Sequence, residues 1–316
     1  MTKATILLGL ALLTSATAVV PASAEENSYA PEAIELKKLE KGKQTLDPAQ
    51  GYIYLTYPDR FAGTFIRVPD EEDIAAYRER MDELRPKFEK RQAKALERWE
   101  EKVQLARASG EEPPEKPEMS FSIGAIETRT AVAVGPRDNF DRWGEDGFSY
   151  LHEVKPGRYI WYGPTAFDSQ QGWVGVCYCM GTVAFNVKAG EITDLGNFLW
   201  AGPKAENQPT VAASQFMISG GWSGSIIKIP QASGEVVYGT PDMVGTMPSR
   251  KADFTAHGKM DNFYGIQISR LPEVPGVLAY ERDRVIDLQK AAVAAQPDSD
   301  PLSTSSTLDE DIKATE

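Results

Sequence analysis

Residues 148–162 have the sequence FSYLHEVKPGRYIWY, and this stretch decides the predicted fold. Aromatic and β-branched residues fill its two halves, a composition typical of strands. Between the halves stands Lys155-Pro156-Gly157-Arg158. Proline presets the first central position of a type II turn, and glycine accepts the positive φ of the second. The stretch therefore predicts a β-hairpin.

Comparable short runs continue on both sides of this stretch, and Lys188-Ala189-Gly190-Glu191 predicts a second hairpin turn. Strands are predicted at residues 52–57, 64–68, 121–126, 130–134, 148–154, 158–162, 173–179, 182–187 and 192–195. Because no helical pattern separates the strands after residue 118, the fold class is mainly β. We expect an antiparallel β-sandwich domain over residues 51–200.

A long amphipathic helix is predicted at 70–109, as an insertion in this domain. Four acidic residues at 70–73 suit a helix N-terminus, and apolar residues then recur at spacings of three and four. Pro86 should kink or split the helix, and Gly110 should end it before a proline-rich acidic linker at 110–118. Forty helical residues would span about 60 Å, so part should project from the domain. The apolar stripe of the second half either packs on a sheet or makes this half an arm for self-association or for binding a partner.

The two ends of the chain have different compositions. Residues 1–24 are predicted to be a signal peptide cleaved after Ala24, which places the mature protein in the periplasm or outside the cell. A flexible leader follows at 25–50, and no later stretch is apolar enough for a transmembrane helix. Residues 201–295 form a second Gly- and Pro-rich β region, and 296–316 form a disordered acidic tail. Within the second region we expect strands at 225–229, 235–238, 263–269 and 277–280 and a closing helix at 282–295.

Composition narrows the classes of function. The 316 residues contain 34 Lys and Arg against 46 Asp and Glu, a formal charge of 34 − 46 = −12. This balance argues against nucleic acid or an anionic membrane surface as the main partner. With 41% hydrophobic and 25% charged residues the chain is globular. Two histidines and two cysteines leave little material for histidine-based catalysis or a four-ligand zinc site.

The passages YLHEVKPGRY (150–159) and VAFNVKAGEI (183–192) resemble a broad group of uncharacterised exported bacterial proteins. In that group a "v-pG-Y" hairpin is followed by an "f-v-aGe" strand and turn in a small β-sandwich. The resemblance covers residues 51–199, with the helix as an extra insertion. It implies an envelope protein without a known active site, and it carries over no functional residues.

The sulfur-rich segment is Cys177-Tyr178-Cys179-Met180. Two thiols one residue apart, with a thioether beside them, could bind a soft ion such as Cu(I). They could also form a redox-active disulfide, although Cα atoms two apart in a regular strand lie about 6.5–7 Å apart, at the edge of what a disulfide tolerates. Burial as thiols is the expected role, because both cysteines share odd parity with the apolar 183–187 run.

Two histidines and one serine are the remaining candidates for chemistry. His257 lies near Asp261, so the two could form an acid–base pair or half a metal site, against the expectation of a lone surface histidine. His152 is expected to be a hydrogen-bonded sheet histidine. The sequence GWSGS at 221–225 resembles a nucleophile elbow around Ser223, but its second glycine comes one place early. A glycine-rich turn is expected there instead.

Aromatic residues are the last candidates, since exposed rings on a β-sandwich could bind glycans, whereas core filling explains most buried ones. Those near predicted strand ends or loops are Trp143, Trp161, Tyr162, Trp173, Trp200 and Trp222.

Together these observations predict a non-enzymatic exported envelope protein, a binding or assembly module whose partner is an envelope protein or a glycan. One alternative is a periplasmic soft-metal or thiol protein, or an enzyme, that uses Cys177, Cys179, Met180 or His257. The other alternative is a glycan-binding sandwich. No catalytic residue, cofactor or metal ligand is assigned.

Overall fold

The computed structural model describes residues 31–57, 60–143, 147–201, 216–217, 226–227, 236–241, 244 and 247–294. The predicted signal peptide, the acidic tail and the Ser223 segment lie outside these residues. The chain divides into two compact units. One contains residues 88–124, and the other contains the described residues on either side of that segment.

Sheet A has six strands in the order β1-β6-β2-β11-β14, with β5 also paired to β6. β2 runs antiparallel to β6, whereas β11 is parallel to both β2 and β14. The predicted all-antiparallel arrangement is therefore wrong for this sheet. Its strands are β1 (Glu32–Ala33), β2 (Gly51–Tyr57), β5 (Asp141–Trp143), β6 (Gly147–Val154), β11 (Ile192–Asp194) and β14 (Ser249–Lys251).

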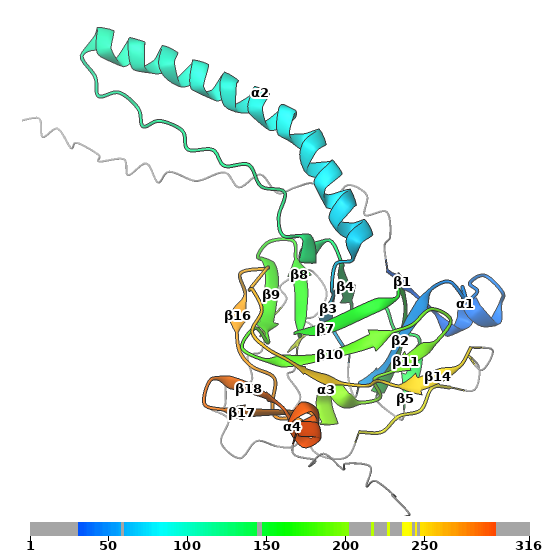
Figure 1. The fold of residues 1–316 in the computed structure, drawn as a ribbon. Coiled ribbons are helices and arrows are strands. Elements are labelled where there is room, and N and C mark those ends of the chain that lie inside the picture. The colour runs from blue at the N-terminus through cyan, green and yellow to red at the C-terminus, as the bar shows by residue number, and fades with distance from the viewer. Residues whose placement is uncertain are drawn as a thin grey trace, which may run out of the picture. The chain divides into compact units, whose positions relative to one another are not determined.

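Sheet B has five antiparallel strands in the order β15-β10-β7-β3-β4. Figure 1 shows β7, β10 and β3 side by side in the green and blue part of the ribbon. The strands of sheet B are β3 (Gly63–Arg67), β4 (Ala131–Val134), β7 (Gly157–Gly163), β10 (Thr182–Val187) and β15 (Thr255–His257).

The two predicted hairpin turns connect different sheets, so neither forms a hairpin. The turn at 155–156 leads from β6 in sheet A to β7 in sheet B, and the turn at 188–191 leads from β10 in sheet B to β11 in sheet A. Gly190 has the positive φ of 68° that the turn chemistry predicted. Turn residues reverse the chain but do not determine which sheet the next strand joins.

The largest apolar core contains side chains from both sheets. Sheet A supplies Ile53, Leu55 and Tyr150, and sheet B supplies Phe65 and Phe185. A second core contains alternate residues of the same sheet A strands, Tyr52, Tyr54 and Leu151, with Leu36 from α1 (Leu36–Glu40). Because both faces of sheet A are covered, β2 is buried along its whole length and its sequence is apolar without alternation.

The C-terminal region contributes strands to both main sheets, through β14 in sheet A and β15 in sheet B. The helix predicted at 282–295 is partly wrong, because a β-hairpin of β17 and β18 precedes the short helix α4. No strand forms at the described part of 235–238 or at 121–126. A third sheet has three strands in the order β16-β9-β8, formed by β8 (Thr165–Asp168), β9 (Gly172–Cys177) and β16 (Gln267–Ile268). The other short elements are α3 (Phe198–Ala201), β12 (Phe216–Met217), β13 (Ile226–Ile227), β17 (Leu278–Glu281), β18 (Arg284–Asp287), α4 (Leu288–Ala294) and the 3₁₀ turn Ile126–Thr128.

The predicted helix forms as α2 (Glu71–Ser109), within one residue of the predicted ends. Its start is capped by two reciprocal bonds, since the Asp70 N–H donates to Asp73 Oδ2 (2.8 Å) and the Asp73 N–H donates to Asp70 Oδ1 (2.9 Å). The helix is continuous through Pro86, so the predicted split is absent. Proline removes one hydrogen bond, and the turns on either side keep theirs.

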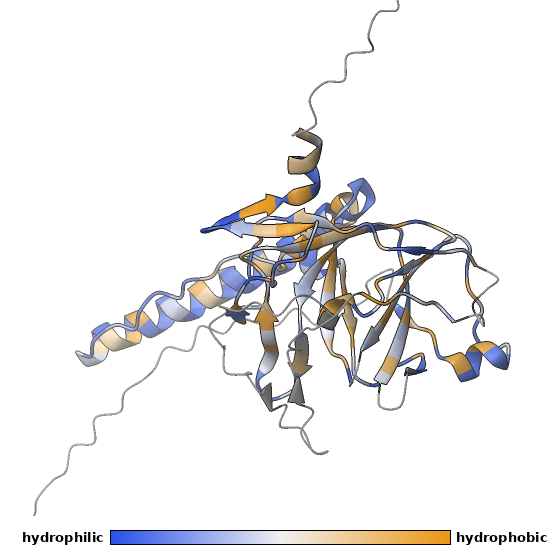
Figure 2. Ribbon diagram, turned by 90° about the horizontal axis from the view of Figure 1, so that it is seen from below, coloured by the Kyte–Doolittle hydropathy of each residue, from blue (hydrophilic) through white to orange (hydrophobic). Residues whose placement is uncertain are grey.

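Within the unit 88–124 the proline-rich linker packs on the second half of α2. The Trp99 Nε1–H donates to the Pro114 carbonyl (2.8 Å), and the rings of Phe88 and Phe121 lie 5.4 Å apart. The hydropathy colouring of α2 alternates along this half (Figure 2). Part of the apolar stripe is thus covered by its own chain, whereas Leu105 remains 70% exposed and self-association through α2 stays a prediction.

Among the described residues, none of the helices is both long and apolar enough to cross a membrane.

Candidate functional site

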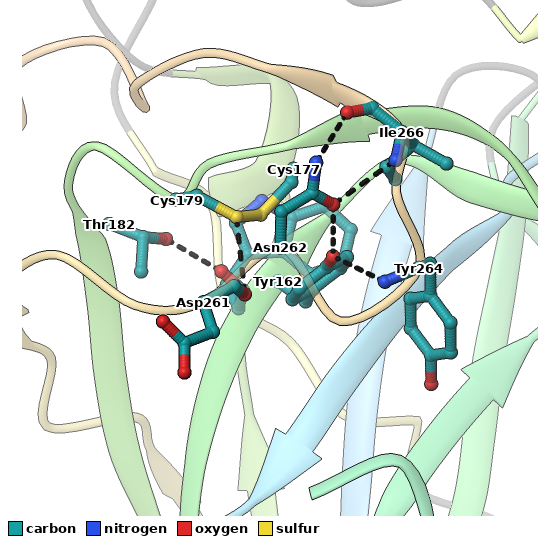
Figure 3. The surroundings of a disulfide bond; sticks show 9 residues. Tyr162, Cys177, Cys179, Thr182, Asp261, Asn262, Tyr264 and Ile266 are labelled. Carbon is teal, nitrogen blue, oxygen red and sulfur yellow. Dashed lines mark hydrogen bonds between the residues drawn. A yellow bond between two sulfur atoms is a disulfide. The ribbon is translucent and has the colours of Figure 1, made fainter. Parts of the chain in front are cut away.

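Cys177 and Cys179 form a disulfide, with Cα atoms 5.1 Å apart, and both are buried (Figure 3). The prediction of burial is confirmed, but the expectation of two free thiols is wrong. The regular-strand spacing that argued against a disulfide does not apply, because β9 (Gly172–Cys177) ends at the first cysteine. The chain then turns at Cys179-Met180, which brings the two Cα atoms closer.

The shared face predicted for these cysteines and the 183–187 run is also wrong. Cys177 and Cys179 pack with Ile66 and Tyr162 in a small cluster, whereas Phe185 belongs to the large core. The parity argument assumed one continuous strand through Gly181. That residue instead has a φ of +144°, and β9 and β10 belong to different sheets.

The soft-metal alternative loses its ligands in this oxidised form. A disulfide sulfur is not a thiolate, and the thiolate is what a soft ion binds. Among the described residues, no group of three or more His, Cys, Asp or Glu side chains gathers as a metal site. Met180, which directly follows the disulfide in the chain, is exposed.

Alkylation should therefore find no reactive thiol. Native and denatured protein treated with iodoacetamide should both gain no adduct, and protein that is denatured and reduced first should gain two. Intact-mass spectrometry gives the count. Two adducts on denatured, unreduced protein would show that the cysteines are buried thiols, as the sequence alone suggested.

Backbone hydrogen bonds join the disulfide segment to residues 260–271. The Ser269 N–H donates to the Cys177 carbonyl (2.8 Å), and the Met260 N–H donates to the Cys179 carbonyl (3.0 Å). Strand β16 (Gln267–Ile268) runs parallel to β9 over the same stretch. These backbone bonds therefore tie the disulfide segment to a segment far away in sequence.

The Asn262 side chain closes the loop between these bonds (Figure 3). Its Nδ2–H donates to the Ile266 carbonyl (2.6 Å), and its Oδ1 accepts from the Ile266 N–H (3.1 Å) and from the Tyr162 hydroxyl (3.1 Å). Gly265 supplies the positive φ of 65° that the tight loop requires. Tyr264, within this loop, is consequently held in one place.

Tyr264 completes a surface cluster of three rings, the aromatic face, with Phe167 and Trp173. Phe167 on β8 (Thr165–Asp168) is the cross-strand partner of Trp173 on β9, with ring centroids 5.8 Å apart. Trp173 stacks on Tyr264 at 4.1 Å, and Tyr264 meets the buried Tyr162 edge-on at 5.3 Å. Phe167 is 64% exposed, whereas Trp173 and Tyr264 are half-buried.

The segments that carry the aromatic face are almost free of charge. Residues 162–181 and 262–269 contain one charged side chain, Asp168, although a quarter of the whole chain is charged. Asp168 is buried, and its Oδ1 accepts from the N–H groups of Gln170 (2.8 Å) and Gln171 (2.9 Å). Its charge is thus used to hold the β8–β9 turn.

His152 does not have the hydrogen bonds expected of it. It is 3% exposed on β6, and within the described structure neither ring nitrogen has a hydrogen-bond partner. Burial lowers the pKa of His152 from 6.5 to about 4, against the opposing charge of Asp138. The ring is therefore neutral and enclosed, without the contact to solvent or partner that proton transfer requires.

His257 is half-buried on β15 and does not pair with Asp261 among the hydrogen bonds of the described residues. Burial and then the positive charge of Arg158 lower the pKa of His257. A neighbouring cation is the opposite of what an acid–base pair needs. The structure thus does not bring the two predicted partners together.

Asp194 is a buried carboxylate that the sequence did not single out. Burial raises its pKa, a feature also found in catalytic acids. Its two oxygens accept from the N–H groups of Gly196 (2.7 Å) and Gly239 (2.8 Å), and the nearby Asn197 Oδ1 accepts from the Val237 N–H (2.7 Å). These bonds make Asp194 a clamp for the 236–240 segment, and they account for its burial without catalysis.

The predicted aromatic candidates separate into two groups. Trp161 and Tyr162 are buried, as core filling predicts, and Trp173 reaches the surface. The side chains of Trp143, Trp200 and Trp222 lie outside the described residues. Phe167 and Tyr264 were missed, and the charge-poor run around Phe167 is the sequence signal that could have indicated this face.

Comparison of the chain with protein-family models, with curated proteins and with solved structures gives no match. The resemblance to exported bacterial proteins therefore stays a prediction.

Proposed function

We propose that this protein is an exported, non-enzymatic binding module of the cell envelope, and that the aromatic face is its ligand-binding surface. The observation that carries the proposal is the 64% exposed ring of Phe167, packed against Trp173 on segments almost free of charge. Single exposed apolar residues are common, but here the exposed ring continues into the stacked rings of Trp173 and Tyr264, and a contiguous aromatic patch is typical of a binding surface.

The geometry supports binding rather than catalysis. Nucleophilic catalysis needs an activated nucleophile beside a base. In the described residues the cysteines are joined in a disulfide, His152 is enclosed without a partner, and Asp194 is occupied by loop amides. These groups are thus committed to structure, and the exposed ring of Phe167 is not.

Two further observations support the scaffold and the compartment. Side chains of sheets A and B share one core, which supports a β-sandwich as the scaffold. A structural disulfide persists in oxidising compartments, which supports export.

The test is co-sedimentation of the purified mature protein with envelope isolated from its own source cells. Phe167→Ser should weaken binding at least about 10-fold, equivalent to about 1.4 kcal/mol, because the most exposed ring is lost. Leu105→Ser on α2 is the matched control, since Leu105 is similarly exposed, at 70%, but lies outside the aromatic face. Equal binding by Phe167→Ser and the unmodified protein would exclude the aromatic face.

A further inference from the structure

We infer that the ligand of the aromatic face is an uncharged glycan, an inference that rests on the proposed binding function. A sugar ring presents apolar C–H faces and polar hydroxyls, so its site needs aromatic faces beside neutral donors and acceptors. The aromatic face supplies the first in Phe167. Gln170, an exposed amide side chain three residues after Phe167 in the β8–β9 turn, can supply the second.

Charge decides between classes of glycan. An anionic polysaccharide or a phosphate group would be recognised by Lys or Arg, which present charge-assisted hydrogen bonds. Residues 162–181 and 262–269 contain neither, and their single charged residue, Asp168, is buried. A chain of formal charge −12 also repels polyanions. The surface therefore matches a ligand without charge.

Size decides between a glycan and a protein partner. A stable protein interface buries about 800 Å² on each partner and involves about 20–30 residues a side. The aromatic face has three rings, of which Phe167 alone is largely exposed. Three rings suit contact with a few sugar units and fall short of the roughly 20–30 residues of a stable protein interface.

The three rings have different roles. Trp173 meets the Phe167 ring edge-on and stacks on the Tyr264 ring, so it acts as a positioning residue. Phe167 offers the ring that the sugar contacts. Because the Asn262 bonds fix the loop that carries Tyr264, the ring stack is already ordered before binding. The conformational entropy that a mobile aromatic would lose on binding is therefore largely absent.

The first experiment is affinity electrophoresis of the mature protein in gels that contain one polysaccharide each. Laminarin and galactomannan are the neutral probes, and alginate and heparin are the anionic ones. A neutral probe should retard the protein, Phe167→Ser should weaken this at least about 10-fold, and Phe167→Trp should retain it. Because no charge is involved, changing the NaCl concentration from 50 to 500 mM should alter the affinity less than about twofold.

The second experiment separates this inference from the proposed function. Isolated envelope is treated with periodate, which oxidises sugar diols, or with proteinase K, and binding is measured by co-sedimentation. Loss of binding after periodate alone, at any NaCl concentration, supports a neutral glycan even if it is absent from the gel panel. Loss after proteinase alone overturns the glycan but leaves a binding module.

Binding that is lost after periodate and also falls steeply with salt would overturn the neutrality of the ligand. Retardation by alginate or heparin that depends on Phe167 would do the same. The thermal midpoints of Phe167→Ser and Phe167→Trp should match that of the unmodified protein, since the ring is exposed. If both variants bind as the unmodified protein does, the proposed function fails together with the glycan.

Discussion

Replacing Arg67 by alanine should lower the free energy of unfolding by about 3 kcal/mol, the low end for a broken buried ion pair. The Arg67 side chain is 7% exposed at the end of β3, and it donates to Asp73 (2.7 Å) and Asp70 (3.1 Å) at the start of α2. Its removal would leave the mostly buried Asp73 carboxylate without its closest cation. Lys155 Nζ, 3.6 Å from Asp73, compensates only in part.

Urea unfolding followed by tryptophan fluorescence measures the effect of Arg67→Ala. The control is Arg80→Ala, which removes an exposed i,i+3 pair with Glu83 on α2 and should cost less than about 1 kcal/mol. If Arg67 and Asp73 form a buried ion pair, Arg67→Ala should lower the free energy of unfolding clearly more than Arg80→Ala does. A loss below 1 kcal/mol for Arg67→Ala would mean that the cluster at the start of α2 is effectively solvated.

Acid should destabilise the protein through His152 at pH values where most carboxylates are still ionised. The unfolded ring has a pKa of 6.5 and the folded ring about 4, so the unfolded state binds the proton more tightly. Stability is then unaffected above pH 6.5, falls as the pH drops from 6.5 toward 4, and loses no more through this group below 4. The difference of 2.5 pKa units corresponds to about 3 kcal/mol.

The comparison of unmodified protein with His152→Leu isolates this contribution, because other titrating groups are common to both. The unfolding free energy of the unmodified protein minus that of His152→Leu should be constant above pH 6.5. At pH 4 this difference should have fallen by about 3 kcal/mol, in favour of the variant. His257→Leu is the control and should give a smaller pH-dependent difference, since His257 is only half-buried. A pH-independent difference for His152→Leu would mean that the folded ring accepts a proton freely.

Local patterns predicted the elements well. The run at 182–187 forms β10 with the predicted ends, because alternating β-branched and aromatic residues between glycine-containing turns leave little choice. The helix ends were also predictable, from the acids at 70–73 and from Gly110, whose φ is +74°. These signals act over a few residues, which is why the sequence reveals them.

Pairing between distant segments could not be predicted in the same way. The parallel partners of β11 are β2 and β14, one far before it and one after it, and nothing in the three residues of β11 specifies them. The aromatic face has the same difficulty, since Tyr264 stacks on Trp173 through a loop held by Asn262. Those contacts depend on the tertiary fold. The buried disulfide depends on the turn at Cys179-Met180, which the alternating pattern of the sequence does not indicate.

The positions of β14 and β15 have a consequence for the order of folding. These strands form the last strand of sheet A and of sheet B, yet they lie at residues 249–257, in the final third of the chain. A chain that emerges N-terminus first, from a ribosome or a membrane translocon, exposes the open edges of β11 and β10 until those residues arrive. Such long-range closure is slow and leaves edges that can aggregate. A chaperone that holds the chain until residues 249–257 arrive would therefore protect both open edges from aggregation.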